Sequence, residues 1–235
     1  MPQGNSVSTN AGKPEWPPKG INWYYSDKWT AIACGDCREI LPQLDVKVDL
    51  VLTDPPYNAE DIGFNKHSYI GQSMKLPDGE YDQLCKDWFS LLDAKVIAIT
   101  CGIANIWKYP PADWILCWDK PNSLSRNRWG GINAWEPILL YGKPANRLVK
   151  DIKRISAFSY GVSGNHPCPK PMELMDWLIL LATNGEGLIL DPFLGSGTTC
   201  FCAKKLNRYS IGIEIEEKYC EIAARRCSQE VMELK

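Results

Sequence analysis

The chain has 235 residues and a formal charge of −2, from 26 basic and 28 acidic side chains. Apolar residues make up 45% and charged residues 23%, a composition that excludes a mainly disordered chain. No stretch approaches the roughly 20 apolar residues of a membrane-spanning helix, and residues 1–20 lack the apolar core of a signal peptide. We therefore expect a cytoplasmic protein with a flexible tail at 1–20 and a single domain at 21–235.

Seven segments are predicted to be strands: 29–34, 48–53, 95–100, 114–119, 136–141, 187–191 and 209–214. Several are continuous apolar runs, typical of strands that are covered on both faces of a parallel sheet. Helical periodicity occurs at 171–183 and 216–230. This alternation predicts an α/β fold, a doubly wound and mostly parallel seven-stranded sheet of Rossmann-like type.

The ten cysteines are scattered along the chain, and we expect them to be reduced thiols that fill core positions. Cys34 and Cys37 form a C-x-x-C pair. A zinc site would need a second pair of ligands, and His67 and His166 are the only histidines. The sequence therefore predicts no metal.

Polar residues follow three of the predicted strands at their carboxyl ends. These are Gly35-Asp36, Asp54-Pro55-Pro56-Tyr57, and the segment 191–199 with sequence DPFLGSGTT. In open α/β sheets, ligands bind at the carboxyl ends of the strands. We therefore expect the functional site at this edge.

The glycine motif lies between a predicted strand and a helix. Gly195 and Gly197 permit a tight turn, and a ligand can approach the backbone where helix N–H groups are unpaired. Glu214 ends the next strand, where nucleotide-binding folds carry the carboxylate that binds ribose. A full G-x-G-x-x-G and a G-K-[ST] are both absent, which favours a nucleoside ligand without phosphates, such as S-adenosylmethionine.

The Asp54–Tyr57 turn is stiff because each proline restricts its own backbone and that of the preceding residue. Prolines donate no N–H, so carbonyl acceptors surround the Asp54 carboxylate, and Tyr57 adds a flat face. Such a pocket suits the exocyclic amine of a nucleobase. The alternative is a rigid surface turn in which Tyr57 is ordinary packing.

With the Asp54 turn preceding the glycine motif, the chain resembles the amino DNA methyltransferases of the permuted β class. The matching segments also include CGDCREILPQL at 34–44, ILCWDKPN at 115–122, AWEPILLYGKP at 134–144 and HPCPKPMELMDWLI at 166–179. The resemblance implies a circularly permuted, S-adenosylmethionine-dependent methyltransferase fold. It departs from the family at Cys168-Pro169, where Thr-Gln is usual.

The resemblance assigns catalysis to Asp54, Pro55, Pro56 and Tyr57. It assigns cofactor binding to Asp36, Lys170, Asp191, Phe193, Gly195, Ser196, Gly197, Thr198, Thr199 and Glu214. The target base would be flipped out of DNA, stacked on Tyr57 and held through its amine by Asp54 and a proline-region carbonyl, without a covalent intermediate or a metal. Adenine N6 is favoured because the family pairs D-P-P-Y mainly with adenine. Cytosine N4 is the alternative.

Segment 120–154 contains eight basic and two acidic side chains, a net charge of +6 in an otherwise acidic chain. This predicts contact with DNA phosphates, and a solvated charged face is the alternative. The residues assigned to DNA are Arg126, Arg128, Arg147, Lys150, Lys153 and Arg154. A short target-recognition insertion is expected near 145–165. We expect Trp135 to pack in the fold and leave Trp129 open.

Two other classes compete with this interpretation. One is a nucleotide-dependent oxidoreductase that uses the glycine loop. The other is a DNA-binding regulator that kept the fold but lost catalysis. RNA as the substrate, a homodimer and pairing with a restriction enzyme are left open.

Overall fold

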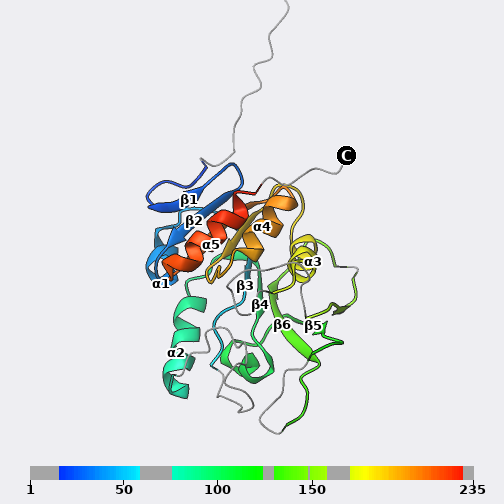
Figure 1. Cartoon of the computed structure of the whole chain (residues 1–235). Coiled ribbons are helices and arrows are strands. Elements are labelled where there is room, and N and C mark those ends of the chain that lie inside the picture. The colour runs from blue at the N-terminus through cyan, green and yellow to red at the C-terminus, as the bar shows by residue number, and fades with distance from the viewer. Residues whose placement is uncertain (1–15, 59–75, 124–129, 148, 158–169, 230–235) are drawn as a thin grey trace, which may run out of the picture.

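The computed structural model describes residues 16–58, 76–123, 130–147, 149–157 and 170–229. Within these ranges, nine strands form one sheet in the order β1-β2-β9-β8-β3-β4-β6-β5-β7. The strands are β1 (Trp23–Ser26), β2 (Thr30–Cys34), β3 (Val48–Thr53), β4 (Ala94–Thr100), β5 (Trp114–Asp119), β6 (Trp135–Gly142), β7 (Ile152–Arg154), β8 (Leu188–Asp191) and β9 (Tyr209–Glu214). The block from β2 to β4 is parallel, and β6 is antiparallel to both of its neighbours. Figure 1 shows the blue N-terminal strands beside the orange and red C-terminal elements.

The predicted fold class is confirmed, and each of the seven predicted strands is present within one residue of its expected bounds. The other two strands are the sheet edges, β1 and β7. Both are short and half exposed, so neither has a long apolar run in the sequence. β7 lies inside the expected insertion at 145–165 and pairs with β5.

The helices are α1 (Cys37–Ile40), α2 (Asp78–Phe89), α3 (Met172–Ala182), α4 (Thr198–Lys205) and α5 (Glu217–Cys227), with 3-10 turns η1 (Leu41–Gln43) and η2 (Ile103–Lys108). The predicted helices at 171–183 and 216–230 are α3 and α5. Sequence analysis missed α2, which is polar overall. Tyr81, Cys85 and Trp88 recur at helical spacing and are at most 2% exposed, so a helical signal was available there.

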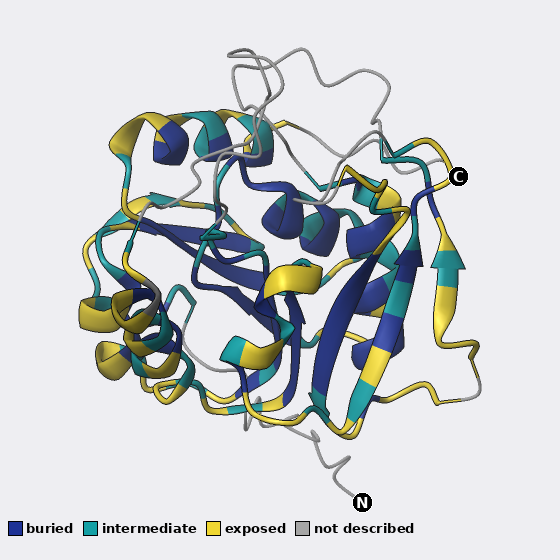
Figure 2. Cartoon of the chain, turned by 90° about the horizontal axis from the view of Figure 1, so that it is seen from below, coloured by how far each residue is buried: buried dark blue, intermediate teal, exposed yellow. Residues whose placement is uncertain are grey.

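Successive side chains of the central strands enter two cores, one on each face of the sheet. On one face, α3 and α4 cover Leu50 and Leu52 of β3. On the other face, α2 covers Val51 of the same strand. Figure 2 shows the central strands buried in dark blue between helices whose outer turns are exposed. Burial on both faces explains why these strands are continuous apolar runs.

Seven of the nine cysteines in the described ranges are buried, as expected for core thiols. Residues 1–15 of the predicted tail and Cys168 lie outside the description. Trp16 already contacts the domain, because its indole donates to the Asp27 carbonyl at 2.8 Å and its ring lies 5.0 Å from that of Tyr209. No helix in the described ranges is long and apolar enough to cross a membrane.

Candidate functional site

The Asp54–Tyr57 turn, which was assigned to catalysis, and the glycine loop follow neighbouring strands, β3 and β8. The Thr53 hydroxyl at the end of β3 donates to Asp191 Oδ1 at the end of β8, at 2.8 Å. β9 and β2 continue the sheet on the far side of β8, so Glu214 and then Asp36 follow along the same edge. Asp36 and Glu214, which are 178 positions apart in the sequence, therefore lie with Asp191 and Thr53 at the carboxyl ends of parallel strands, as predicted.

Asp54 is anchored through one of its two carboxylate oxygens. Oδ1 accepts from the Thr100 hydroxyl at 2.6 Å and from the Tyr57 hydroxyl at 2.8 Å, and Lys170 Nζ lies 3.1 Å from it. Within the described residues, Oδ2 has no hydrogen-bond donor. The side chain is 33% exposed. Oδ2 is therefore the atom with which Asp54 can accept from a ligand.

The two prolines differ in the use of their carbonyls. The Tyr81 hydroxyl of α2 donates to the Pro56 carbonyl at 3.0 Å. The Pro55 carbonyl accepts no hydrogen bond from the described residues. The Pro55 oxygen is therefore available as a second acceptor in the turn.

The Tyr57 hydroxyl lies within 3.0 Å of Asp54 Oδ1, Glu136 Oε1 and Lys170 Nζ. Its single proton goes to a carboxylate, and its oxygen accepts from the lysine. Burial and the two carboxylates raise the pKa of Tyr57 well above its ordinary value. A Cβ added at Gly102, whose φ is +65°, would lie 3.3 Å from the Tyr57 ring, so glycine there lets the ring pack against the backbone.

Glu136 pairs with two lysines, Lys120, which is buried, and Lys170, whose side chain is 12% exposed. Its Oε1 lies 2.9 Å from Lys170 Nζ, and its Oε2 lies 3.1 Å from Lys120 Nζ. Burial alone would raise the pKa of Glu136, but Lys170 and Lys120 outweigh it and lower that pKa to about 2. Burial opposes the charged form of Lys170, yet Asp54 and Glu136 raise its pKa overall.

This cluster bears on two expectations from the sequence, the positive charge of segment 120–154 and the assignment of Lys170. Lys120 contributed to the predicted positive segment, but its side chain is 10% exposed and paired with Glu136, so it is an internal ion. The resemblance assigned Lys170 to the cofactor. Its three N–H donors contact Asp54, Glu136 and Tyr57, and its role toward the cofactor stays a prediction. Sequence analysis did not identify Thr100, Gly102, Lys120 or Glu136 as site residues.

The glycine loop requires glycine at two positions. Gly195 and Gly197 have φ values of +54° and +81°, in the left-handed region. A Cβ on Gly197 would lie 2.9 Å from the Ala223 Cα and Cβ atoms in α5. The loop thus passes directly over α5, and the N-terminus of α4 begins at its end.

Glu214 holds this loop in place. Its Oε2 accepts from the Gly195 N–H at 2.8 Å, and its Oε1 accepts from the Glu216 N–H at 2.9 Å. Burial raises the pKa of Glu214. Each carboxylate oxygen has a second lone pair, so both can still accept from a ligand hydroxyl.

The remaining predicted cofactor residues differ in what their side chains contact. Ser196 and Thr198 accept from the Arg226 guanidinium of α5, at 3.4 and 2.8 Å. Phe193 packs edge-on against Trp88, with ring centroids 5.0 Å apart. The Thr199 hydroxyl lies 3.9 Å from Met175 Sδ in the core.

Asp36 caps α1 by accepting from the Arg38 N–H at 2.8 Å, and it also binds the Arg38 guanidinium. The hydrogen bond from Arg38 lowers the pKa of Asp36, although partial burial opposes this. The acid is therefore ionised and held at the end of β2. It lies beside the strand that ends in Glu214.

Asp191 makes a testable contribution to stability. Burial raises its pKa from 3.8 to about 6, and hydrogen bonds from Thr199 and Thr53 oppose this only in part. Between these pKa values, folded Asp191 holds a proton that the unfolded chain has lost, so stability falls as the pH rises through the window. Relative to Asp191→Asn, the free energy of unfolding should fall by up to about 1.4 kcal/mol per pH unit. Urea denaturation of both proteins between about pH 4 and 7 measures this, and parallel pH profiles would contradict it.

Four of the six predicted DNA contacts lie in the described ranges, and Arg126 and Arg128 lie outside them, as does Trp129. Arg147, Lys150 and Arg154 are exposed and Lys153 is half-buried. Arg154 Nε lies 2.6 Å from Asp119 Oδ2.

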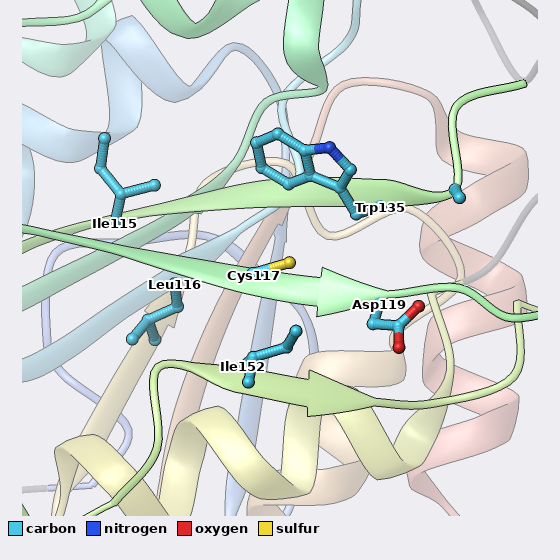
Figure 3. Close-up of a pocket in the computed structure, with 7 residues that line it drawn as sticks. Ile115, Leu116, Cys117, Asp119, Trp135 and Ile152 are labelled. Atoms are coloured by element: carbon cyan, nitrogen blue, oxygen red, sulfur yellow. The ribbon is translucent and has the colours of Figure 1, made fainter. Parts of the chain in front are cut away.

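A surface depression of about 440 Å³ lies on the outer face of β5, β6 and β7, away from the glycine loop. Figure 3 shows Trp135 there on β6, with Cys117 on the neighbouring strand β5 and Ile152 on β7. Trp135 was expected to pack in the fold, but its side chain is 40% exposed. All of its lining residues belong to these three strands except Ala134, which directly precedes β6.

Comparisons with known proteins identify the family. A sequence model of the N6/N4 DNA methylases matches residues 48–225. M.HpaI, a Type II methyltransferase of Haemophilus parainfluenzae, is 28% identical over 85% of this chain and 74% of its own length.

The crystal structure of the M1.HpyAVI–SAM complex has a TM-score of 0.63 at 25% identity, covering 85% of this chain and all of that one. The cytosine-N4-specific PvuII DNA methyltransferase has a TM-score of 0.69 at 17% identity over 91% of both chains, a likeness of fold alone. The resemblance inferred from the motifs is confirmed, and the chain belongs to the S-adenosylmethionine-dependent N6/N4 DNA methylase family.

Proposed function

We propose that this DNA methyltransferase transfers a methyl group from S-adenosylmethionine to the N6 amino group of adenine in DNA. The proposal rests on the hydrogen bond between the Thr53 hydroxyl and Asp191. This bond joins a turn that offers acceptors for an amine to a glycine loop suited to the cofactor. A methyl donor and a nucleobase amine bound at these two places would be neighbours.

The glycine loop and the adjacent strand ends fit S-adenosylmethionine. The close backbone approach at Gly197 and the left-handed Gly195 form a narrow turn. The N–H groups of Gly195 and Gly197 donate to Glu214 and to the Leu194 carbonyl, so the N–H groups at the start of α4 are the ones that can face a ligand. Glu214 and Asp36 place carboxylates at the next two strand ends for ribose hydroxyls and the adenine moiety. Ser196 and Thr198 would contribute through their backbones, because Arg226 binds their side chains. When bound, the cofactor supplies an electrophilic methyl group on a sulfonium sulfur.

The two acceptors of the turn would hold both hydrogens of the target amine. Asp54 Oδ2 and the Pro55 carbonyl accept no hydrogen bond from the described residues, whereas Asp54 Oδ1 and the Pro56 carbonyl do. Holding both hydrogens reduces conjugation of the nitrogen lone pair with the ring and aims it at the donor. Catalysis of this kind consists of orientation and charge placement by groups that are fixed beforehand.

The target base would have to leave the duplex, because its amine is not accessible within the base stack. Tyr57 is fixed at its hydroxyl and along the side that faces Gly102. We expect the flipped base to stack on the opposite face. The exposed Arg147 and Lys150 would contact phosphates on the surrounding duplex.

Adenine is preferred to cytosine because the resemblance associates an aspartate at position 54 with adenine. The competing hypothesis is a regulator that binds DNA and cofactor without catalysis. Membership of the DNA methylase family removes the oxidoreductase alternative.

Nucleoside mass spectrometry tests the proposal. Purified chain is incubated with S-adenosylmethionine and unmethylated DNA, and with RNA in parallel. We expect N6-methyldeoxyadenosine in the DNA and no methylated base in the RNA. N4-methyldeoxycytidine would refute the choice of base, and cofactor binding without any methylated nucleoside would favour the regulator.

A further inference from the structure

We propose that Glu136 is a positioning residue for methyl transfer, which holds Tyr57 and Lys170, and through them Asp54, in the reactive arrangement. The inference rests on the proposed function and deepens it. Glu136 does not face the amine acceptors itself. It acts on the hydroxyl and the ammonium that contact Asp54 Oδ1.

The geometry makes Glu136 the centre of the buried cluster. Oε1 lies 2.8 Å from the Tyr57 hydroxyl and 2.9 Å from Lys170 Nζ, while Oε2 lies 3.1 Å from Lys120 Nζ. The Glu136 side chain is 8% exposed. It belongs to β6, a central strand, at the position paired with Trp118 of β5, and Lys120 directly follows β5. The carboxylate is therefore fixed by the sheet.

The charges of the cluster alternate along a line from Lys120 through Glu136 and Lys170 to Asp54. Their sum is zero. Each buried cation contacts a carboxylate, which offsets the cost of removing it from water. Glu136 is the one member shared by both lysines, so its loss would leave Lys120 without a carboxylate partner among the described residues and Lys170 with Asp54 alone.

This arrangement affects the reaction because Lys170 and the target amine compete for the carboxylate of Asp54. All three N–H donors of Lys170 are used, one each by Asp54, Glu136 and Tyr57. Without the negative charge of Glu136, both Lys170 and the Tyr57 hydroxyl would turn fully to Asp54. Asp54 would be drawn away from the amine, and its negative charge would be neutralised more strongly.

Two variants of the full chain separate positioning from simple support of the fold. Glu136→Gln keeps the shape but removes the charge and leaves an excess buried cation. Lys120→Met together with Glu136→Gln removes that excess cation. Tm, the Kd for S-adenosylmethionine and kcat on DNA are measured for both variants and for the wild type.

We expect Glu136→Gln to lower Tm and to lower kcat by about 100-fold, the effect of misplacing a reacting group by about 1 Å. The double variant should regain much of the lost Tm while kcat stays low, with cofactor affinity preserved in both. If kcat recovers together with Tm, Glu136 only supports the fold and the proposal is overturned. The double variant keeps this test available if the single variant does not fold.

A second measurement does not depend on activity. The ¹⁵N ammonium signal of Lys170 should exchange slowly with water in the wild type, because three acceptors hold its protons, and faster in both variants. Fast exchange in the wild type would overturn the proposal. A wild type that shows slow exchange but methylates no DNA would refute the proposed function alone.

Discussion

Replacing Asp54 with alanine should lower the rate of methyl transfer by about 10³-fold and leave S-adenosylmethionine binding intact. The variant loses one of the two acceptors proposed for the target amine, and fixed polar groups of this kind contribute about 10²–10³ in rate. It also leaves Lys170 and the Tyr57 hydroxyl with Glu136 as their remaining carboxylate. The rate is measured as tritiated methyl incorporation into DNA, and cofactor binding by calorimetry.

Asp45→Ala provides the matched control, because Asp45 is an exposed aspartate in the loop that precedes β3. Its rate should equal that of the wild type. Comparable loss in both variants would mean that charge or folding, rather than the acceptor, accounts for the effect. Full activity of Asp54→Ala would remove the turn from the mechanism.

Replacing Gly197 with alanine should destabilise the protein by about 2–5 kcal/mol and weaken cofactor binding. The left-handed backbone costs about 1–2 kcal/mol for a residue with a Cβ, and overpacking adds about 1–3 kcal/mol. The new Cβ would lie 2.9 Å from Ala223 Cα, so the loop or α5 must shift. That shift would widen the turn on which the cofactor is expected to lie.

Gly185→Ala separates the cost of the left-handed backbone from the cost of overpacking against α5. Gly185 has a φ of +59°, and an added Cβ would meet no atom within 4 Å. This variant should therefore lose only the backbone contribution, about 1–2 kcal/mol, and bind the cofactor normally. Urea denaturation and calorimetry on both variants measure the difference. Equal losses would show that the approach to α5 is not close in solution.

The fold and the two motifs could be predicted because their signals are local. Each central strand is an apolar run of a few residues, and each motif follows its strand directly. That Asp54 and Asp191 would meet then followed from a general property of parallel sheets. The edges β1 and β7 escaped prediction because they are short and half exposed.

The ionic cluster was not predicted because its members are far apart in the sequence and come together only when the sheet forms. Tyr57 and Glu136 are 79 positions apart, and Tyr57 and Lys170 are 113 apart. Each residue taken singly has another interpretation: Lys120 increased the apparent positive charge of its segment, and Lys170 belonged to a motif associated with the cofactor. A glutamate inside the apolar run of β6 was the available signal, because a buried carboxylate requires a partner.

The strand order has a consequence for how the protein is made. β8 and β9 are the last strands of the described chain to be synthesised, yet they fill the middle of the sheet, between β2 and β3. Until they emerge from the ribosome, β2 and β3 each present an unsatisfied backbone edge that can pair with another chain. We therefore expect slow folding dominated by long-range pairing, and nascent chains halted before β8 should aggregate.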